Sequence, residues 1–309
     1  MIDIFIPSYH RPNNLKTVNY FKSIGYDMSK IHVFIDSEAD DKAEYEKETG
    51  IKGFQLHVFD MVEARKRYDY VHRPSVSRRS AGQARNMFYD YAQKAGIDFF
   101  IMQDDDTQGY EIKTRNGYIR MADIKEILFV FLRVKTLMQK RKIGLFGLSQ
   151  TGDFIGGNYK DYKNSLRPKV MNTIFVDTRF IYRGERGVQD DDTSQFINVL
   201  NEGLFTGSLS MGVVLKQTTS ALQPGGLTDL YNECKLFNKA CVTPVQFPSA
   251  IRVDRQVKNG NRVHHRINNR YLMPKLLKSE DRQGNIAWDT YDSDMMPFTC
   301  EPLNRRKVD

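Results

Sequence analysis

The chain has few cysteines and no long apolar segment, and each shortage argues against a class of protein. The chain has three cysteines, an odd number, and no two of them have C-x-x-C spacing. Both facts argue against a disulfide framework or a structural zinc site. The longest apolar run, residues 127–132, is too short to span a bilayer. Residues 1–6 lack the basic start of a secretory signal. We expect a soluble protein of a reducing compartment, the cytoplasm (of a host cell if the protein is viral), with no membrane partner.

The composition is that of a large, basic globular protein. Of its 309 residues, 40% are hydrophobic and 12% are aromatic, which is enough for one large domain or a domain with an extension. The 46 lysines and arginines exceed the 38 aspartates and glutamates, so the net charge is +8 and the isoelectric point is about 9.2. This balance favours a polyanionic partner without identifying one.

Short apolar runs alternate with helical patterns through the first part of the chain. The spacing predicts strands at residues 3–7, 31–35, 54–59 and 99–102, and helices at 15–24, at 40–48 (stopping at Gly50) and from about 84 to 95. Alternation of this kind is typical of a parallel α/β sheet. Further on, the pattern predicts a hairpin or loop at 109–120, a long amphipathic helix at 121–140, strands at 143–148 and 170–177, and a helix at 194–201.

Three adjacent aspartates, Asp104 to Asp106, follow the apolar run at 99–102. In an open α/β sheet, ligands bind at the carboxyl ends of the strands, and adjacent carboxylates repel one another and attract a cation. Oxygen-only ligands suit Mg²⁺ or Mn²⁺. Alternate residues of an extended segment point the same way, so Asp104 and Asp106 can meet one ion while Asp105 points elsewhere and matters less. The alternative is a solvated turn that caps a following helix.

Several motifs in this order resemble a GT-A-fold, nucleotide-sugar-dependent glycosyltransferase. They are the end of the first strand at 6–9, Asp36 after the second strand, a helix start at 82–86 that contains Arg85, the three aspartates as an Asp-x-Asp motif, and a second acidic cluster at 190–192. Together they cover about residues 1–215. The basic balance and the second cluster resemble the TET/JBP-associated glycosyltransferases, which glycosylate hydroxymethylated bases in DNA.

The resemblance implies an α/β fold with a GT-A-like (Rossmann-related), mostly parallel sheet flanked by helices. Residues 1–216 would form the catalytic domain, and residues 217–309 a basic acceptor-binding extension. The donor would be a nucleoside diphosphate sugar, a UDP-sugar first of all. Donor-binding residues would be Pro7, Tyr9, Arg11, Asp36, Arg79, Arg85 and Asp104. Asp36 has the alternative role of a turn or helix-cap residue, Tyr9 that of loop packing, and Arg79 that of a solvated basic face.

A bound Mn²⁺ or Mg²⁺ would neutralise the departing diphosphate. Asp104 and Asp106 are its expected ligands, and a late histidine, His265, could complete the metal shell. The alternative for His265 is a polar surface pair with His264. Transfer also needs a carboxylate that removes the proton of the acceptor hydroxyl. Asp191 is the first choice for this base, followed by Asp190 and Asp192, with an acidic helix start as the alternative.

If DNA is the acceptor, lysine and arginine contacts to phosphates should dominate the affinity. The candidates are Lys66, Arg67, Arg252, Arg255, Lys258, Arg262 and Arg266. Three other functions stay open at this point. They are transfer to a polysaccharide, lipid-linked glycan or protein, a metal-dependent nuclease or nucleotidyltransferase, and a non-catalytic nucleic-acid-binding module.

Overall fold

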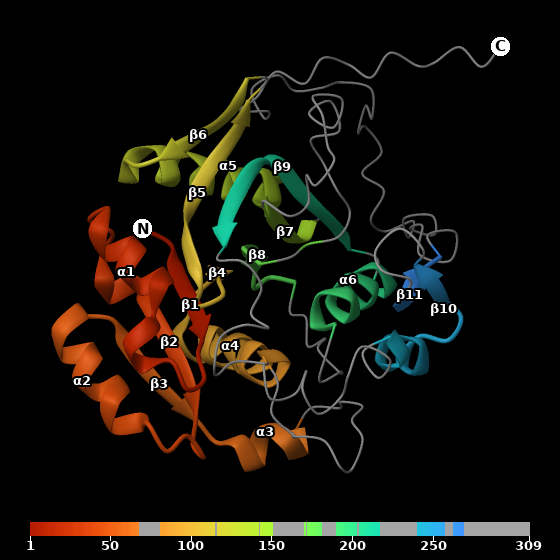
Figure 1. Ribbon diagram of the computed structural model, residues 1–309, viewed down its shortest axis with the longest axis horizontal. Coiled ribbons are helices and arrows are strands. Elements are labelled where there is room, and N and C mark those ends of the chain that lie inside the picture. The colour runs from red at the N-terminus through yellow and green to blue at the C-terminus, as the bar shows by residue number, and fades with distance from the viewer. Residues whose placement is uncertain are drawn as a thin grey trace.

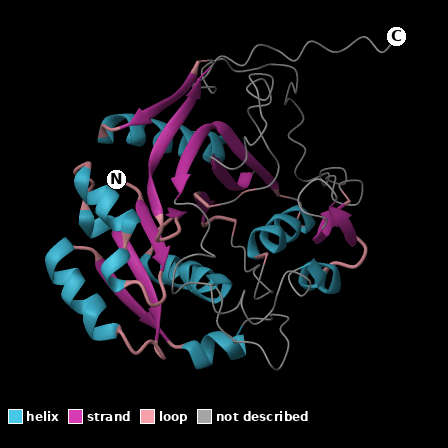
Figure 2. Ribbon diagram, in the orientation of Figure 1, coloured by secondary structure: helices cyan, strands magenta, loops and turns pink. Residues whose placement is uncertain are grey.

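A computed structural model describes residues 1–67, 81–114, 116–141, 143–150, 170, 172–180, 190–202, 204–216, 240–256 and 262–268. Within them a nine-stranded sheet is flanked by helices on both faces (Figures 1 and 2). The strand order is β3-β2-β1-β4-β8-β7-β9-β5-β6. The sheet is parallel from β3 to β4 and mixed beyond β4. The expected α/β fold class is confirmed.

The elements lie close to where the sequence predicts them. The strands of the sheet are β1 (Asp3–Pro7), β2 (Ile31–Asp36), β3 (Gln55–Phe59), β4 (Phe99–Met102), β5 (Thr107–Thr114), β6 (Gly117–Met121), β7 (Ile143–Gln150), β8 (Ile174–Asp177) and β9 (Phe205–Lys216). The helices are η1 (Pro12–Asn14), α1 (Lys16–Ser23), η2 (Met28–Lys30), α2 (Lys42–Lys52), α3 (Met61–Arg67), α4 (Ala81–Ala95), α5 (Ile124–Lys140) and α6 (Asp191–Asn201). The predicted hairpin is confirmed as the antiparallel pair β5–β6.

Three elements differ from the predictions. Helix α2 does not stop at Gly50 but continues to Lys52 and closes on Gly53, which has the left-handed φ of 82° that glycine tolerates. Arg65, Lys66 and Arg67 lie in the last turn of α3, a helix that the apolar pattern does not predict. The strand β9 was not expected either.

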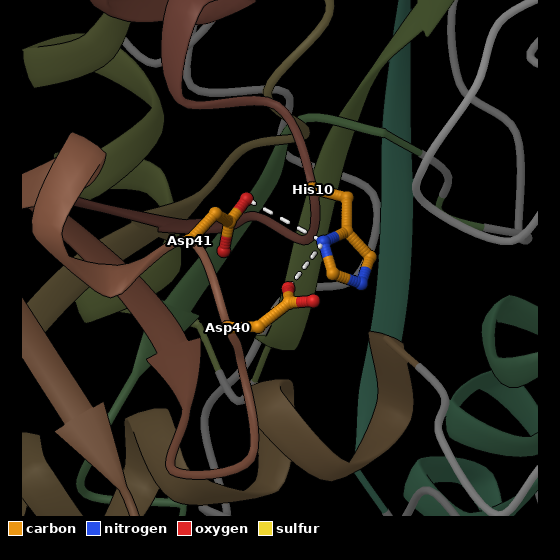
Figure 3. A group of neighbouring side chains, drawn as sticks. All are labelled: His10, Asp40 and Asp41. Atoms are coloured by element: carbon orange, nitrogen blue, oxygen red, sulfur yellow. Dashed lines mark ion pairs between the residues drawn. The ribbon is translucent and has the colours of Figure 1, made fainter.

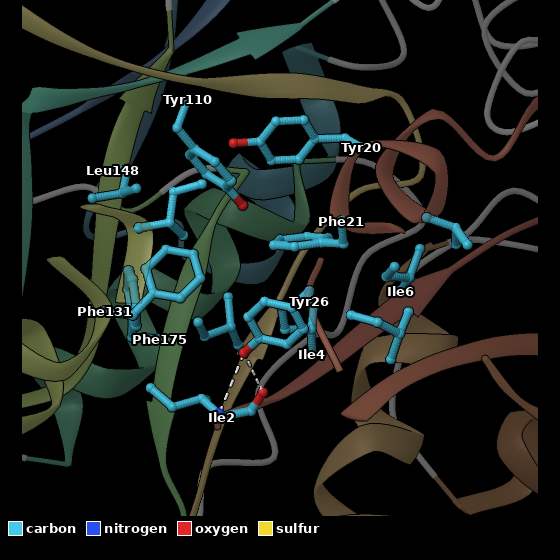
Figure 4. Close-up of a cluster of buried hydrophobic side chains, with 14 of the residues drawn as sticks. Ile2, Ile4, Ile6, Tyr20, Phe21, Tyr26, Tyr110, Phe131, Leu148 and Phe175 are labelled. Atoms are coloured by element: carbon cyan, nitrogen blue, oxygen red, sulfur yellow. Dashed lines mark hydrogen bonds between the residues drawn. The ribbon is translucent and has the colours of Figure 1, made fainter. Parts of the chain in front are cut away.

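Two apolar cores cover the two faces of the sheet because side chains alternate along each strand. In β1, Ile4 and Ile6 face one core while Phe5 faces the other. Helices α1, α2 and α5 contribute to the first core, which Figure 4 shows, and α3, α4 and α6 contribute to the second. Within the first core, the buried Tyr26 hydroxyl donates to the carbonyl of Ile2 (2.7 Å). The sheet is therefore a rigid base for the loops at its edge.

The described part of the carboxyl-terminal third packs against α6. It consists of a helix at residues 240–246 and the antiparallel hairpin β10 (Ile251–Gln256) and β11 (Arg262–Ile267). Phe196 and Ile197 of α6 form a small buried cluster with Ala250 and Ile251 (Figure 1, right). The division into residues 1–216 and 217–309 remains a prediction. No helix among the described residues has the length and apolarity needed to cross a membrane.

Candidate functional site

The strand order creates a switch point between β1 and β4. The chain proceeds from β1 to β2 and β3 on one side, and β4 then pairs with the other side of β1. Loops that leave the carboxyl ends of two such strands diverge and form a crevice, which is where ligands bind in open α/β sheets. The loop after β1 begins at Ser8, and the loop after β4 carries Asp104 to Asp106. Both predicted loops therefore lie at the same switch point.

Asp105 fastens these two loops together. Its carboxylate accepts hydrogen bonds from the Ser8 hydroxyl (2.9 Å) and from Nη1 of Arg11 (3.0 Å). Because Ser8 donates to Asp105, the Tyr45 hydroxyl donates to Ser8 (2.8 Å), and it accepts from the backbone N–H of Arg11 (3.1 Å). Burial raises the pKa of Asp105 to about 6, while Arg11 opposes that shift. Asp105 and Asp106 lie in a turn rather than in the expected extended segment. Asp105 pairs with the loop after β1 while Asp104 pairs with Arg85, so the middle aspartate organises the loop rather than mattering less.

Arg85 connects the two acidic clusters. It lies on α4, is only 6% exposed, and donates through Nη2 to Oδ1 of Asp104 (2.7 Å). Its Nη1 donates to Oδ2 of Asp191, the first residue of α6. Burial raises the pKa of Asp191, as do the neighbouring aspartates, and Arg85 lowers it. One guanidinium therefore brings the end of β4 and the start of α6 together, which neither local sequence pattern indicates.

The late histidine reaches the second cluster. His265 of β11 is buried, and its Nδ1 lies 3.2 Å from Oδ2 of Asp190, the residue that precedes α6. Alternation in the hairpin explains the burial, since His265 pairs with Val253 on the face turned to α6 while His264 pairs with Asp254 on the other. The structure places His265 beside Asp190, and its role as a metal ligand stays a prediction.

Other predicted donor residues surround the switch point. Asp36, at the end of β2, accepts from the backbone N–H of Glu38 (2.8 Å), which is the turn role named as its alternative. Pro7 ends β1, and the ring of Tyr9 lies 3.9 Å from that of His10. Arg79 lies outside the described residues. Asp106 belongs to the first acidic cluster and Asp192 to the second, and the roles of both stay predictions.

A further trio in the same region was not expected from the sequence. His10 has a left-handed φ of 54°, and its Nδ1 lies 3.3 Å from Asp40 and 3.5 Å from Asp41 (Figure 3). Among the described residues it is the one group of three His, Cys, Asp or Glu side chains with ligand atoms within 4.8 Å of one another. Asp40 is largely exposed, and clusters of exposed carboxylates are common without a metal. We therefore interpret the trio as an ion-pair contact that joins the loops after β1 and β2.

The comparison with protein families decides between the enzyme classes left open by the sequence. The model of the TET-associated glycosyltransferases matches residues 2–226, most of the chain. The chain belongs to this family. It is therefore a glycosyltransferase, as the resemblance implied, and the matched range contains both acidic clusters and Arg85. No curated protein sequence matches the chain.

Solved structures of glucosyl-3-phosphoglycerate synthase from Mycobacterium tuberculosis resemble this TET-associated glycosyltransferase. A complex with Mn²⁺, uridine diphosphate and glucosyl-3-phosphoglycerate has 12% identity, covers 87% of each chain and has a TM-score of 0.46. A complex with Mg²⁺ and uridine diphosphate has 12% identity, the same coverage and a TM-score of 0.45. A complex with Mn²⁺, UDP-glucose and phosphoglyceric acid has 13% identity, covers 87% of this chain and 86% of the other, and has a TM-score of 0.45.

The predicted DNA-binding residues of the glycosyltransferase divide into two places. Arg252 and Arg266 are directly opposed on the outer face of the hairpin β10–β11, and both pair with Asp254, at 3.5 and 3.1 Å. Arg255 is exposed on β10. Lys66 lies on α3, where it pairs with Glu63 (3.0 Å). Arg67 and Arg262 have only their backbone described, in α3 and β11, and Lys258 lies outside the described residues.

Proposed function

We propose that this glycosyltransferase transfers a sugar from a nucleoside diphosphate sugar, a UDP-sugar first of all, to a hydroxymethylated base in DNA. The observation that carries the proposal is the bridge from Asp104 through Arg85 to Asp191 at the switch point of the sheet. Asp104, a candidate metal ligand, and Asp191, a partly buried candidate base, therefore share one guanidinium, and these are the two groups that glycosyl transfer needs. Membership of the TET-associated family supports DNA as the acceptor.

The first acidic cluster fits a divalent cation. Asp104 and Asp106 offer oxygen ligands only, and Asp104 already pairs with the guanidinium of Arg85. Asp105 is committed to Ser8 and Arg11, which leaves the two outer aspartates to hold Mn²⁺ or Mg²⁺. When bound, the ion supplies Lewis-acid neutralisation of the departing diphosphate.

Asp191 is the residue we assign as the general base. Its carboxylate lies at the amino end of α6, and burial raises its pKa from the ordinary value of an aspartate. A base whose pKa is nearer to neutral accepts a proton more effectively at physiological pH. In the reaction, the acceptor hydroxyl loses its proton to Asp191, its oxygen bonds to the sugar, and the bond between the sugar and the diphosphate breaks. The hydrogen bond from Arg85 holds this carboxylate toward the first cluster.

The acceptor would be held by the outer face of the hairpin β10–β11. Arg252 and Arg266 lie side by side there, and guanidinium groups bind phosphate oxygens through two parallel hydrogen bonds. The hairpin packs on α6 through Ile251, and α6 begins at Asp191, so this basic face and the candidate base share one rigid unit. A phosphate backbone bound at the hairpin would be positioned relative to the base.

Mass spectrometry of nucleosides tests the proposal directly. The protein, Mn²⁺ and a panel of nucleoside diphosphate sugars are incubated with a duplex that carries hydroxymethylated pyrimidines and with the matched unmodified duplex. We expect a sugar on the hydroxymethylated base only, and a loss of about 10²- to 10⁴-fold in rate for Asp191→Asn. Asp98→Asn, at the opposite end of β4, is the matched control. Transfer to a glycan or protein but never to DNA would refute the DNA acceptor, and metal-dependent DNA cleavage without a donor would favour a nuclease.

A further inference from the structure

Arg85 lies where a divalent cation would also bind. Its guanidinium contacts Asp104, one of the two carboxylates assigned to the metal, at 2.7 Å. The side chain of Arg85 is 8% exposed, whereas that of Asp104 is 25% exposed. Solvent therefore reaches the carboxylate while the guanidinium is held from the protein side. Arginine remains protonated in proteins, so this contact is a permanent positive charge against the metal ligand.

A cation that approaches Asp104 meets two obstacles. The guanidinium already satisfies one oxygen of that carboxylate, and like charges within a few ångströms repel strongly in a partly buried site. Arg85 also has a second anchor at Asp191, so it is not displaced by loss of Asp104 alone. A diphosphate changes this balance, since phosphate oxygens are good partners for a guanidinium and add negative charge beside the ion.

We propose that Arg85 acts as an internal cation that keeps divalent metal affinity low until a diphosphate binds. Binding of the metal and binding of the donor are then coupled. The diphosphate pairs with Arg85 and weakens its repulsion of the ion, and the ion in turn favours the diphosphate beside Asp104. Arg85 is in this view a positioning residue of the metal site rather than only a phosphate clamp. The proposal rests on the proposed function, because it takes Asp104 as a metal ligand.

Mn²⁺ binding without catalysis tests the proposal. The concentration of free Mn²⁺ is followed by electron paramagnetic resonance in titrations of the full chain, with and without uridine diphosphate, for wild type, Arg85→Gln and Asp104→Asn. We expect Arg85→Gln to bind Mn²⁺ alone about tenfold more tightly than wild type, because one adjacent positive charge has been removed. Uridine diphosphate should tighten Mn²⁺ binding more in wild type than in Arg85→Gln. Asp104→Asn should weaken Mn²⁺ binding in both conditions.

Arg85→Lys keeps the experiment decisive if Arg85→Gln does not fold. Lysine retains the charge but has no fork to span Asp104 and Asp191, so Mn²⁺ alone should bind about threefold more tightly than to wild type. Mn²⁺ binding to the folded variants that is no tighter than to wild type would overturn the proposal. If wild type still transfers sugar with Mn²⁺ in that case, the proposed function stands and only the role of Arg85 is refuted. Absence of any sugar transfer would instead refute the proposed function.

Discussion

Replacing Asp105 by asparagine is expected to destabilise the fold rather than to act on the metal. Asparagine has nearly the same shape, so it keeps an acceptor for Ser8 but removes the charge that balances the buried Arg11. Both side chains are less than a tenth exposed. Removal of one partner of a buried ion pair costs about 3–5 kcal/mol, because the remaining charge is left without compensation. The burial that raises the pKa of Asp105 to about 6 already destabilises its ionised form and offsets part of that cost. We therefore expect Asp105→Asn to lower the free energy of unfolding by about 1–2 kcal/mol at pH 8.

Urea unfolding followed by circular dichroism measures this effect. The double variant Asp105→Asn/Arg11→Met should recover about 1–2 kcal/mol relative to Asp105→Asn, because it removes the uncompensated guanidinium. Asp40→Asn, at an 85% exposed carboxylate, is the matched control and should change the free energy by less than about 0.5 kcal/mol. A loss below about 1 kcal/mol for Asp105→Asn, or a double variant no more stable than Asp105→Asn, would refute the reasoning.

Two further predictions concern DNA binding and acid stability. Asp254→Asn should raise duplex affinity about three- to fivefold at low salt in a fluorescence anisotropy titration, because Asp254 competes with phosphate for Arg252 and Arg266; unchanged affinity would contradict this. Burial and the neighbouring His32 lower the pKa of His57 to about 4. Its unfolded pKa is about 6.5, so the unfolded state binds the proton first. The difference corresponds to about 3 kcal/mol, which solvent screening of the half-buried ring reduces to about 2 kcal/mol of stability lost as the pH falls from 6.5 to 4. Urea midpoints for His57→Gln should vary less over that range, and an equally steep loss would contradict this.

The order of the elements and the place of the first acidic cluster were predictable because their signals are local. Phe99 to Met102 are apolar at every position, as a strand covered on both faces must be, and the aspartates follow at once. Gly96 and Gly117 mark an end and a turn because their left-handed φ angles, 65° and 137°, favour glycine. Where two glycines competed, at Gly50 and Gly53, the sequence gives no local reason to prefer the second.

The side-chain partners of the site were not predictable, because they come from segments far apart in the chain. Arg85 lies 106 residues from Asp191, and Ser8 lies 97 residues from Asp105. A local pattern fixes which way a side chain leaves its strand or helix, but not what a distant segment presents to it. The roles of Asp105 and His265 therefore changed once the sheet was assembled.

The sequence by itself determined an α/β chain with two acidic clusters, a basic net charge and the motifs of a glycosyltransferase. Apolar periodicity, turn residues and charge can all be recognised within short stretches of the chain. Only the tertiary structure decided that one guanidinium joins the two clusters and that the middle aspartate fastens the loop after β1. It also decided that His265 turns inward to Asp190 while Arg252 and Arg266 face outward. The physical reason is that charges in a partly buried site must find partners, and folding alone brings those partners within reach.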